Sequence, residues 1–194
     1  RWVDLGLPSG ILWAAYNVGA TSPEEYGGYY AWGETEEKSS YTWENYVYRE
    51  KIHFSNGEWE WIGRDIGNDI SNTQYDVATI IWKDGARMPT LSDIEELGQH
   101  CTFKPGVYQD VKGCYIIGSN GNRIFLSYGG YIDCDGQDFR EYAGYYWLAN
   151  IYGDYPASSC TLAVDNDGMD WSEDWDRAYG HSVRPVKDKP KEEQ

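Results

Sequence analysis

The sequence predicts an α+β domain with antiparallel sheets, and two observations lead to that class. Residues 73–82 and 90–97 each carry a helix-start signal followed by apolar residues at helical spacing. Several pairs of short apolar stretches flank turn-forming Gly, Asn or Pro, which is typical of hairpins. Hairpins that precede and follow the helices indicate the α+β class rather than alternating β-α units.

The first elements are a hairpin and a short helix. Residues 2–19 predict the hairpin, with its turn at residues 8–10. Ser22, Pro23 and Glu25 predict the helix. Ser caps free N–H groups, Pro suits the first helical position, and Glu completes a capping box.

Residues 29–33 predict a short strand, and residues 34–70 follow without a hydrophobic period. The second stretch carries several Trp and Tyr residues among its charges, whereas disordered segments are poor in aromatics. We therefore expect a long ordered loop between residues 34 and 70.

Two helices are predicted next. Thr73 precedes the apolar residues 75–82, and Thr90 with Asp93 forms a capping box that begins the second helix. The second helix carries one apolar stripe, made of Leu91, Ile94 and Leu97.

The rest of the chain is predicted to be β. Residues 115–126 form a hairpin around Asn120-Gly121, a strong short-range turn signal. Residues 160–171 alternate apolar and polar side chains up to a turn at residues 166–168, which predicts another hairpin.

Composition excludes some partners. At 194 residues the chain fits one domain with a sizeable core. Its 32 acidic and 16 basic residues give a net charge of -16, which repels the phosphates of nucleic acid and of anionic membranes. No apolar run approaches the roughly 20 residues that span a bilayer.

The chain opens at Arg1 without an initiator Met, so we expect a processed product from which a leader was removed.

The four cysteines are Cys101, Cys114, Cys134 and Cys160, and none of their spacings is C-x-x-C. Zinc-ribbon and thioredoxin-type centres are therefore disfavoured. A core of this size needs no disulfide, so mostly buried free thiols are favoured over two disulfides.

The segment 145–181 indicates a binding surface. Tyr and Trp crowd there among Ser, Gly, Asn and Asp, and this mixture offers large contact area at low entropic cost. The competing interpretation is ordinary aromatic packing on a β-rich surface. The predicted ligand contacts are Tyr152, Asp154, Tyr155, Asp170, Trp171, Glu173, Trp175, Asp176 and Tyr179.

Enzyme chemistry has little support in the sequence. His53, His100 and His181 are far apart along the chain, and no G-x-S-x-G nucleophile elbow occurs. His100 is expected to interact with a helix end, and His181 to face solvent on the binding surface. We expect no catalytic residue, no cofactor and no metal.

Calcium is the main chemical alternative. Residues 133–138 and 165–170 both set carboxylates at alternating positions, as a hard cation needs. Neither completes an EF-hand, and Asp-Gly also makes tight turns, so turns are favoured.

Most of the 10 Trp and 18 Tyr residues are expected in the core, with Trp13, Trp32, Trp82 and Trp147 as the predicted core residues. Stacking on a carbohydrate is a second use that suits some exposed aromatics of the binding segment. They are Trp171, Trp175, Tyr152 and Tyr155.

Several motifs in one order resemble the Fibrobacter-type major paralogous domain family, and they cover nearly the whole chain. They comprise residues 3–10 (VDLGLPSG), 13–14 (WA), 17–20 (NVGA), 24–27 (EEYG), 31–35 (AWGET), 75–78 (YDVA), 87–90 (RMPT), 96–97 (EL) and 182–186 (SVRPV).

This resemblance implies a C-type-lectin-like fold, related to formylglycine-generating enzymes and to bacterial variable receptors, on secreted or surface-anchored bacterial proteins. In that fold the first and last strands pair, so residues 2–5 are expected near residues 182–186. The domain would cover residues 1–186, with a charged tail over 187–194.

The resemblance also extends to receptors diversified by retroelements. Residues 145–147 and 180–186 would be constant brackets, and residues 148–179 a displayed insert. Adenine mutation of an Asn codon cannot give Trp, Met or Glu, so Met169, Trp171, Glu173 and Trp175 would have to be constant or come from other codons.

The expected function is a non-enzymatic, surface-displayed binding domain of adhesion or receptor type, with a protein ligand on the segment 148–181. The alternatives are a glycan-binding module, with or without calcium, and, third, an oxidase that resembles the formylglycine-generating enzymes. None of the four cysteines can be placed on that oxidase pattern.

Overall fold

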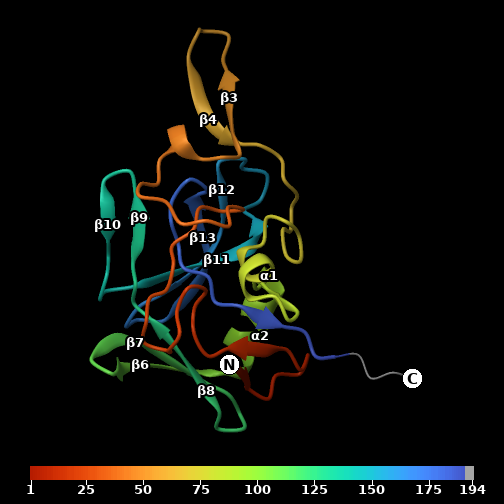
Figure 1. Ribbon diagram of the computed structural model, residues 1–194, viewed down its shortest axis with the longest axis vertical. Coiled ribbons are helices and arrows are strands. Elements are labelled where there is room, and N and C mark those ends of the chain that lie inside the picture. Colours follow the sequence, from red (N-terminus) through yellow and green to blue (C-terminus); the bar gives the residue numbers. More distant parts are fainter. Residues whose placement is uncertain (191–194) are drawn as a thin grey trace.

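The computed structural model describes residues 1–190, and the chain is an α+β protein with two α-helices and several antiparallel sheets (Figure 1). The predicted α+β class is therefore confirmed. No helix among the described residues is long and apolar enough to cross a membrane.

The two ends of the domain share one four-stranded sheet with the order β1-β2-β14-β5. The N-terminal hairpin forms as predicted, with Val3 opposite Trp13. The last strand, however, pairs with β2 and β5 and not with β1, so the expected direct pairing of the first and last strands is wrong. The strands are β1 (Trp2–Asp4), β2 (Leu12–Ala14), β5 (Ala86–Arg87) and β14 (Val186–Lys187).

The start of the expected charged tail packs onto the body. Lys187 lies in β14, and the carboxylate of Asp188 accepts a hydrogen bond of 2.7 Å from Arg87. Residues 191–194 of that tail lie outside the described residues.

Arg184 fixes the closing segment in the core. Its guanidinium is buried and donates to Asn17 Oδ1 at 2.7 Å and to the carbonyls of Phe125 and Ala14 at 2.7 and 3.2 Å. These acceptors lie in two separate parts of the chain, so Arg184 ties the closing segment to the N-terminal hairpin and to the second half of the chain.

Both longer predicted helices are present: α1 (Val77–Trp82) and α2 (Leu91–His100). Asp76, and not Thr73, caps α1. The Thr90–Asp93 capping box begins α2 as predicted, and Ile94 and Leu97 are fully buried.

The predicted helix at residues 22–25 does not form, because the Glu25 carboxylate accepts the backbone N–H of Thr21 at 2.7 Å and stabilises a turn. Residues 29–33 contribute only one bridge, between Tyr30 and His181.

The expected loop over residues 34–70 contains a hairpin and a short 3-10 helix. All five residues of β3 are exposed, and the hairpin projects from one end of the molecule (Figure 1). The elements are η1 (Trp43–Asn45), β3 (Arg49–His53) and β4 (Trp59–Gly63).

The second half of the chain is built of antiparallel hairpins, as predicted. One sheet has the order β6-β7-β8, a second pairs β9 with β10, and a third has the order β11-β12-β13. They are β6 (Thr102–Tyr108), β7 (Val111–Ile117), β8 (Arg123–Ser127), β9 (Tyr131–Asp133), β10 (Gly136–Asp138), β11 (Gly144–Ile151), β12 (Ser158–Val164) and β13 (Met169–Asp176).

The four Trp residues predicted for the core are buried: Trp13, Trp32 and Trp147 at 0% exposure and Trp82 at 7%. Trp13 belongs to the cluster that joins α2 to the central sheets, and the other three to a second cluster around α1. The indole N–H of Trp32 donates to Leu148 O at 2.9 Å, so this ring also has its polar group satisfied.

Candidate ligand-binding face

The candidate site lies on one face of the β11-β12-β13 sheet. In an antiparallel sheet, residues in register share a face. Trp147 is opposite Thr161, which is opposite Glu173, and Ser159 is opposite Trp175. We call the surface made by Tyr145, Glu173 and Trp175 on this sheet, with Tyr131 and Tyr179 beside them, the ligand face.

Aromatic rings pack closely at the centre of the ligand face. The Trp175 ring centroid lies 4.6 Å from that of Tyr131 and 5.0 Å from that of Tyr145. Tyr179 stacks on Tyr131 at 6.4 Å. Trp175 and Tyr179 remain partly exposed, while Tyr131 and Tyr145 are nearly covered. The cluster thus presents ring edges and faces on a rigid base.

His181 lies beneath this cluster, and the expectation that it faces solvent is wrong. Its side chain has 0% exposure and stacks on Trp147 at 4.1 Å. Nδ1 lies 3.1 Å from the Thr161 hydroxyl oxygen. Burial lowers the pKa of His181 to about 3, so the ring is neutral at physiological pH.

A hollow of about 280 Å³ opens at one edge of the ligand face, and carboxylates line it. None of the described residues that line it is basic. Burial and the nearby Glu173 charge raise the pKa of Tyr145 to about 12, which keeps its hydroxyl protonated. The acidic lining residues are Asp165, Asp167, Asp170 and Glu173.

Local hydrogen bonds hold two of these carboxylates. Asp165 Oδ1 accepts the backbone N–H groups of Asp167 and Gly168, which closes the β12–β13 turn. Asp170 Oδ1 accepts the hydroxyl and N–H of Ser172 at 2.6 and 2.8 Å, and these bonds lower the pKa of Asp170. The hollow is therefore anionic at neutral pH.

A second hollow of about 190 Å³ lies at the other end of the sheet, where the β11–β12 loop meets the segment after β4. Asp154 and Tyr155 of the loop line one side, and Asp65 and Asn68 line the other. The buried Arg177 closes it from within.

The predicted contact residues divide among these places. Asp154 and Tyr155 line the second hollow, Asp170 and Glu173 line the first, and Trp175 and Tyr179 join the aromatic cluster. Tyr152 is 38% exposed in the β11–β12 loop.

Asp176 and Trp171 are less accessible to a ligand than the other predicted contacts. Burial raises the pKa of Asp176, while hydrogen bonds from Trp43 and Tyr179 act in the opposite direction. Trp171 lies on the opposite face of the sheet, packed with the core beside α2: a Cβ at Gly98 would lie 2.6 Å from its ring.

The expectation that residues 148–179 form a displayed insert is wrong for much of that segment. β12 is the middle strand of its sheet, and six of its seven residues are buried. Leu148 and Ala149 of β11 are fully buried as well. Exposure is confined to the β11–β12 loop, the β12–β13 turn and part of β13.

The sequence does not predict three residues of the site. Tyr131 and Arg177 carry no local signal, and Tyr145 falls in an expected constant bracket. The Asp165–Asp167 alternation was visible, and the structure places it in a turn at the rim of the first hollow.

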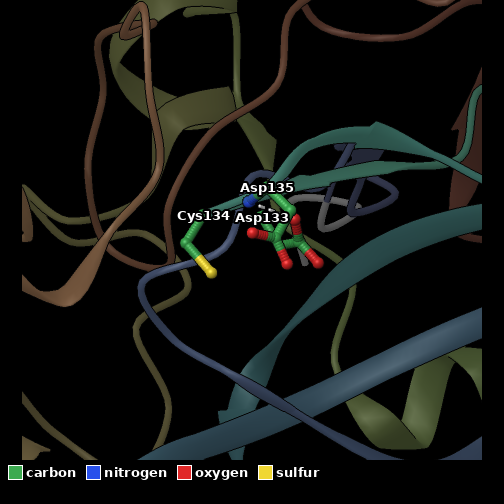
Figure 2. A group of neighbouring side chains, drawn as sticks. All are labelled: Asp133, Cys134 and Asp135. Atoms are coloured by element: carbon green, nitrogen blue, oxygen red, sulfur yellow. Dashed lines mark hydrogen bonds between the residues drawn. The ribbon is translucent and has the colours of Figure 1, made fainter.

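The other acidic run also forms a turn. Asp133 Oδ1 accepts the backbone N–H of Asp135 at 2.8 Å between β9 and β10. Ligand atoms of Asp133, Cys134 and Asp135 lie within 4.8 Å of one another, and Figure 2 shows the three side chains gathered at the tip of this hairpin. The hydrogen bond accounts for the spacing, so the turn interpretation is favoured.

The cysteines are all free among the described residues. Burial raises the pKa of Cys101 to about 11 and that of Cys114 to about 12, and it also raises the pKa of Cys160. These three thiols are therefore protonated and unreactive at neutral pH. Cys134 is exposed at the β9–β10 turn.

Comparisons with known proteins found no matching family model, no matching curated protein and no matching solved structure.

Proposed function

We propose that this chain is a non-enzymatic ligand-binding domain of adhesion or receptor type, which contacts its ligand through the exposed parts of the segment 148–181. The same proposal includes a C-type-lectin-like fold of the Fibrobacter-type major paralogous domain family and display on the bacterial surface or outside the cell. Those parts rest on the sequence motifs.

One observation carries the proposal: a carboxylate-lined hollow lies directly beside a rigid aromatic cluster. Asp170 and Glu173 border the hollow, and Tyr145 is common to both features. Aromatic rings supply contact area at low entropic cost, and an uncompensated anionic hollow favours a ligand with basic groups. A protein ligand with exposed Lys or Arg side chains would complement both the carboxylates of the hollow and the aromatic rings.

The surroundings of the titratable groups support a binding role over catalysis. His181 is buried and neutral, while His53 and His100 lie on β3 and at the end of α2. Three of the four thiols are held protonated by burial. A nucleophile needs a general base within hydrogen-bond reach, and the Thr161 hydroxyl lies beside His181, but both side chains have 0% exposure and are closed to a substrate.

Glycan binding is the second candidate, and the β11–β12 loop favours it. Tyr155 is 60% exposed and lies beside Asp154 at the second hollow. An exposed ring next to a carboxylate suits a sugar, whose C–H face stacks and whose hydroxyls donate hydrogen bonds.

The test is binding to two arrays, one of purified secreted and cell-surface proteins and one of defined glycans. We expect wild type to be retained on a protein, and Asp170→Asn with Glu173→Gln to weaken that binding at least about tenfold. Glu95→Gln, at an exposed carboxylate of α2, is a single-charge control away from this face.

Equal loss in the control, or unchanged binding of the double variant, would reject this face as the site. Retention on glycans alone would favour the second candidate. Diversification of the exposed positions is tested at the coding locus: a reverse transcriptase gene and a near-copy of the 3′ end that differs at adenines would establish it, and their absence would leave an ordinary paralogous domain.

A further inference from the structure

We propose that the second hollow is a pocket for a single acidic sugar residue, a hexuronate, whose carboxylate is bound by Arg177. This inference rests on the proposed function in its glycan-binding form, and it names the ligand class of one part of that surface. Arg177 was not among the residues expected from the sequence.

The pocket has a rigid frame. Gly63 at the end of β4 donates its N–H to Pro156 O at 2.8 Å, and Ile151 donates to Asn68 O at 3.1 Å. These two hydrogen bonds fix the β11–β12 loop against the segment after β4. At about 190 Å³ the space takes one monosaccharide-sized group, because pockets for drug-sized ligands hold roughly 300–1,000 Å³.

Arg177 is a buried cation that forms no salt bridge among the described residues, and the charge of Asp65 offsets its burial only in part. Its side chain is 4% exposed, and no carboxylate of the described residues lies within salt-bridge distance of it. Nε donates to Ser158 O at 3.2 Å, and the guanidinium lies 4.7 Å above the Trp32 ring. Burial accordingly lowers the pKa of Arg177. A buried charge without a partner is costly, and an anionic ligand would remove that cost.

The other two buried arginines provide the contrast. Arg184 is matched by three acceptor oxygens, and Arg87 is matched by Asp93 and Asp188 at 2.6 and 2.7 Å. Arg177 has only its Nε bond, so its two Nη groups have no acceptor among the described residues.

These free donors border the pocket. Gly63 and Arg177 both line the pocket, and a Cβ at Gly63 would lie 2.6 Å from Arg177 Nη1, so a larger residue at this position would crowd that nitrogen. The two Nη groups form a planar fork, which matches the two oxygens of a carboxylate.

The rest of the lining suits a sugar that carries this carboxylate. Asp65, Asp154 and Asn68 offer oxygens to sugar hydroxyls, and the Tyr155 ring offers a stacking face. A phosphate has no apolar face to stack on the Tyr155 ring, and a peptide carboxyl terminus has no hydroxyls to donate to the surrounding acceptors. Among anions of this size, a hexuronate matches both the single cation and the surrounding acceptors.

The experiment titrates the full chain with D-galacturonate and D-glucuronate and, as matched neutral probes, with D-galactose and D-glucose. NMR follows the Nε–Hε signal of Arg177, and calorimetry gives the affinity. We expect a saturable shift of that signal with at least one uronate, and binding of the matching neutral sugar at least tenfold weaker.

Variants test the same contact. Arg177→Lys keeps a charge but loses the fork, and we expect uronate affinity to fall roughly tenfold to a hundredfold. Because Arg177 also holds Ser158, circular dichroism must confirm that the variant folds. Asp154→Asn and Tyr155→Ala lie at the exposed rim and give a second test, with an expected loss of at least threefold each. Glu95→Gln serves as the control.

Absence of uronate binding, equal binding of uronate and neutral sugar, or unchanged affinity in folded Arg177→Lys and in both rim variants would overturn the proposal. A peptide with a free carboxyl terminus, compared with its amidated form, covers the other source of carboxylate. Binding of that peptide without uronate binding also overturns the sugar assignment. If uronates fail while Asp170→Asn with Glu173→Gln still loses array binding, only this inference fails.

Discussion

His181 lies under the aromatic rings of the ligand face with its Nε2 buried and without a hydrogen-bond partner among the described residues. Proton uptake there would place a charge in an apolar stack. The depressed pKa of about 3 follows from this burial, against about 6.5 in the unfolded chain. The histidine therefore links the stability of the fold to pH.

The sign of this linkage is set by which state binds the proton. Below pH 6.5 the unfolded chain protonates His181 and the native chain does not, so stability is lost as the pH falls toward 3. Between pH 7 and pH 5 we expect wild type to lose about 2 kcal/mol more than His181→Gln in urea unfolding. Parallel curves for the two proteins would contradict a buried neutral histidine. The raised pKa of Asp176 changes stability with pH in the opposite direction, but this contribution is the same in wild type and in His181→Gln.

Trp171 and Trp175 are two of the predicted contacts, and they lie on opposite faces of one sheet. Trp171→Ala should lower the free energy of unfolding by about 3 kcal/mol, because its ring packs with the core next to Gly98. Trp175→Ala should weaken ligand binding more than Trp171→Ala does, and it should lower the free energy of unfolding less. Denaturant unfolding together with the protein array separates the two effects; a binding defect in folded Trp171→Ala that exceeds that of Trp175→Ala would count against this assignment.

At the scale of elements, the start of α1 depends on one buried carboxylate. Asp76 is fully buried and accepts the N–H groups of Ala78 and Thr79, which caps the helix. It also accepts the N–H groups of Asn72 and Met88, so it joins the helix to two flanking segments.

Asp76→Ala should cost about 3 kcal/mol, because the cap is lost and several buried N–H groups lose their acceptor. Thermal unfolding measures the effect, and Glu95→Gln on the surface of α2 serves as the control. A change below about 1 kcal/mol would show that water replaces the carboxylate.

Short-range signals explain which elements were predicted correctly. The Thr90–Asp93 capping box and the Asn120-Gly121 turn are local, and both formed as expected. The Asn56-Gly57 turn has the same signal, but its hairpin was missed because β3 is exposed on both faces and shows no apolar alternation. Asp76 was missed as a cap because Thr73, three residues earlier, is a favoured capping residue as well, and residue type alone does not choose between the two.

For the candidate site, composition located the segment but not its faces. The β12–β13 register shifts between Thr161 and Ala163, and a shift of one residue moves side chains to the other face of a sheet. That irregularity separates Trp171 from Trp175. Nor does any sequence pattern distinguish Arg177 from the other two buried arginines, since the difference lies in their partners.

At the scale of the whole molecule, the net charge of -16 gives stability and binding opposite salt dependences. Like charges repel in the folded chain, and the Debye length falls from about 30 Å at 0.01 M salt to about 3 Å at 1 M.

Raising sodium chloride from 0.01 to 0.5 M should therefore raise the melting temperature by a few degrees, as measured by differential scanning calorimetry. Binding to a basic protein partner should weaken over the same range. A fall in both quantities would contradict charge repulsion as the dominant long-range term.

The projecting β3–β4 hairpin has a consequence for association between molecules. Its sheet has only two strands, so each strand leaves one edge with unpaired backbone groups. An extended segment of another chain can pair with such an edge, which is the first step of strand-mediated aggregation. Arg49, Glu50, Lys51 and Glu60 set charges of both signs along these edges and oppose the approach of an apolar strand. The hairpin can therefore project from the body with Trp59 47% exposed while its edges are protected by charge.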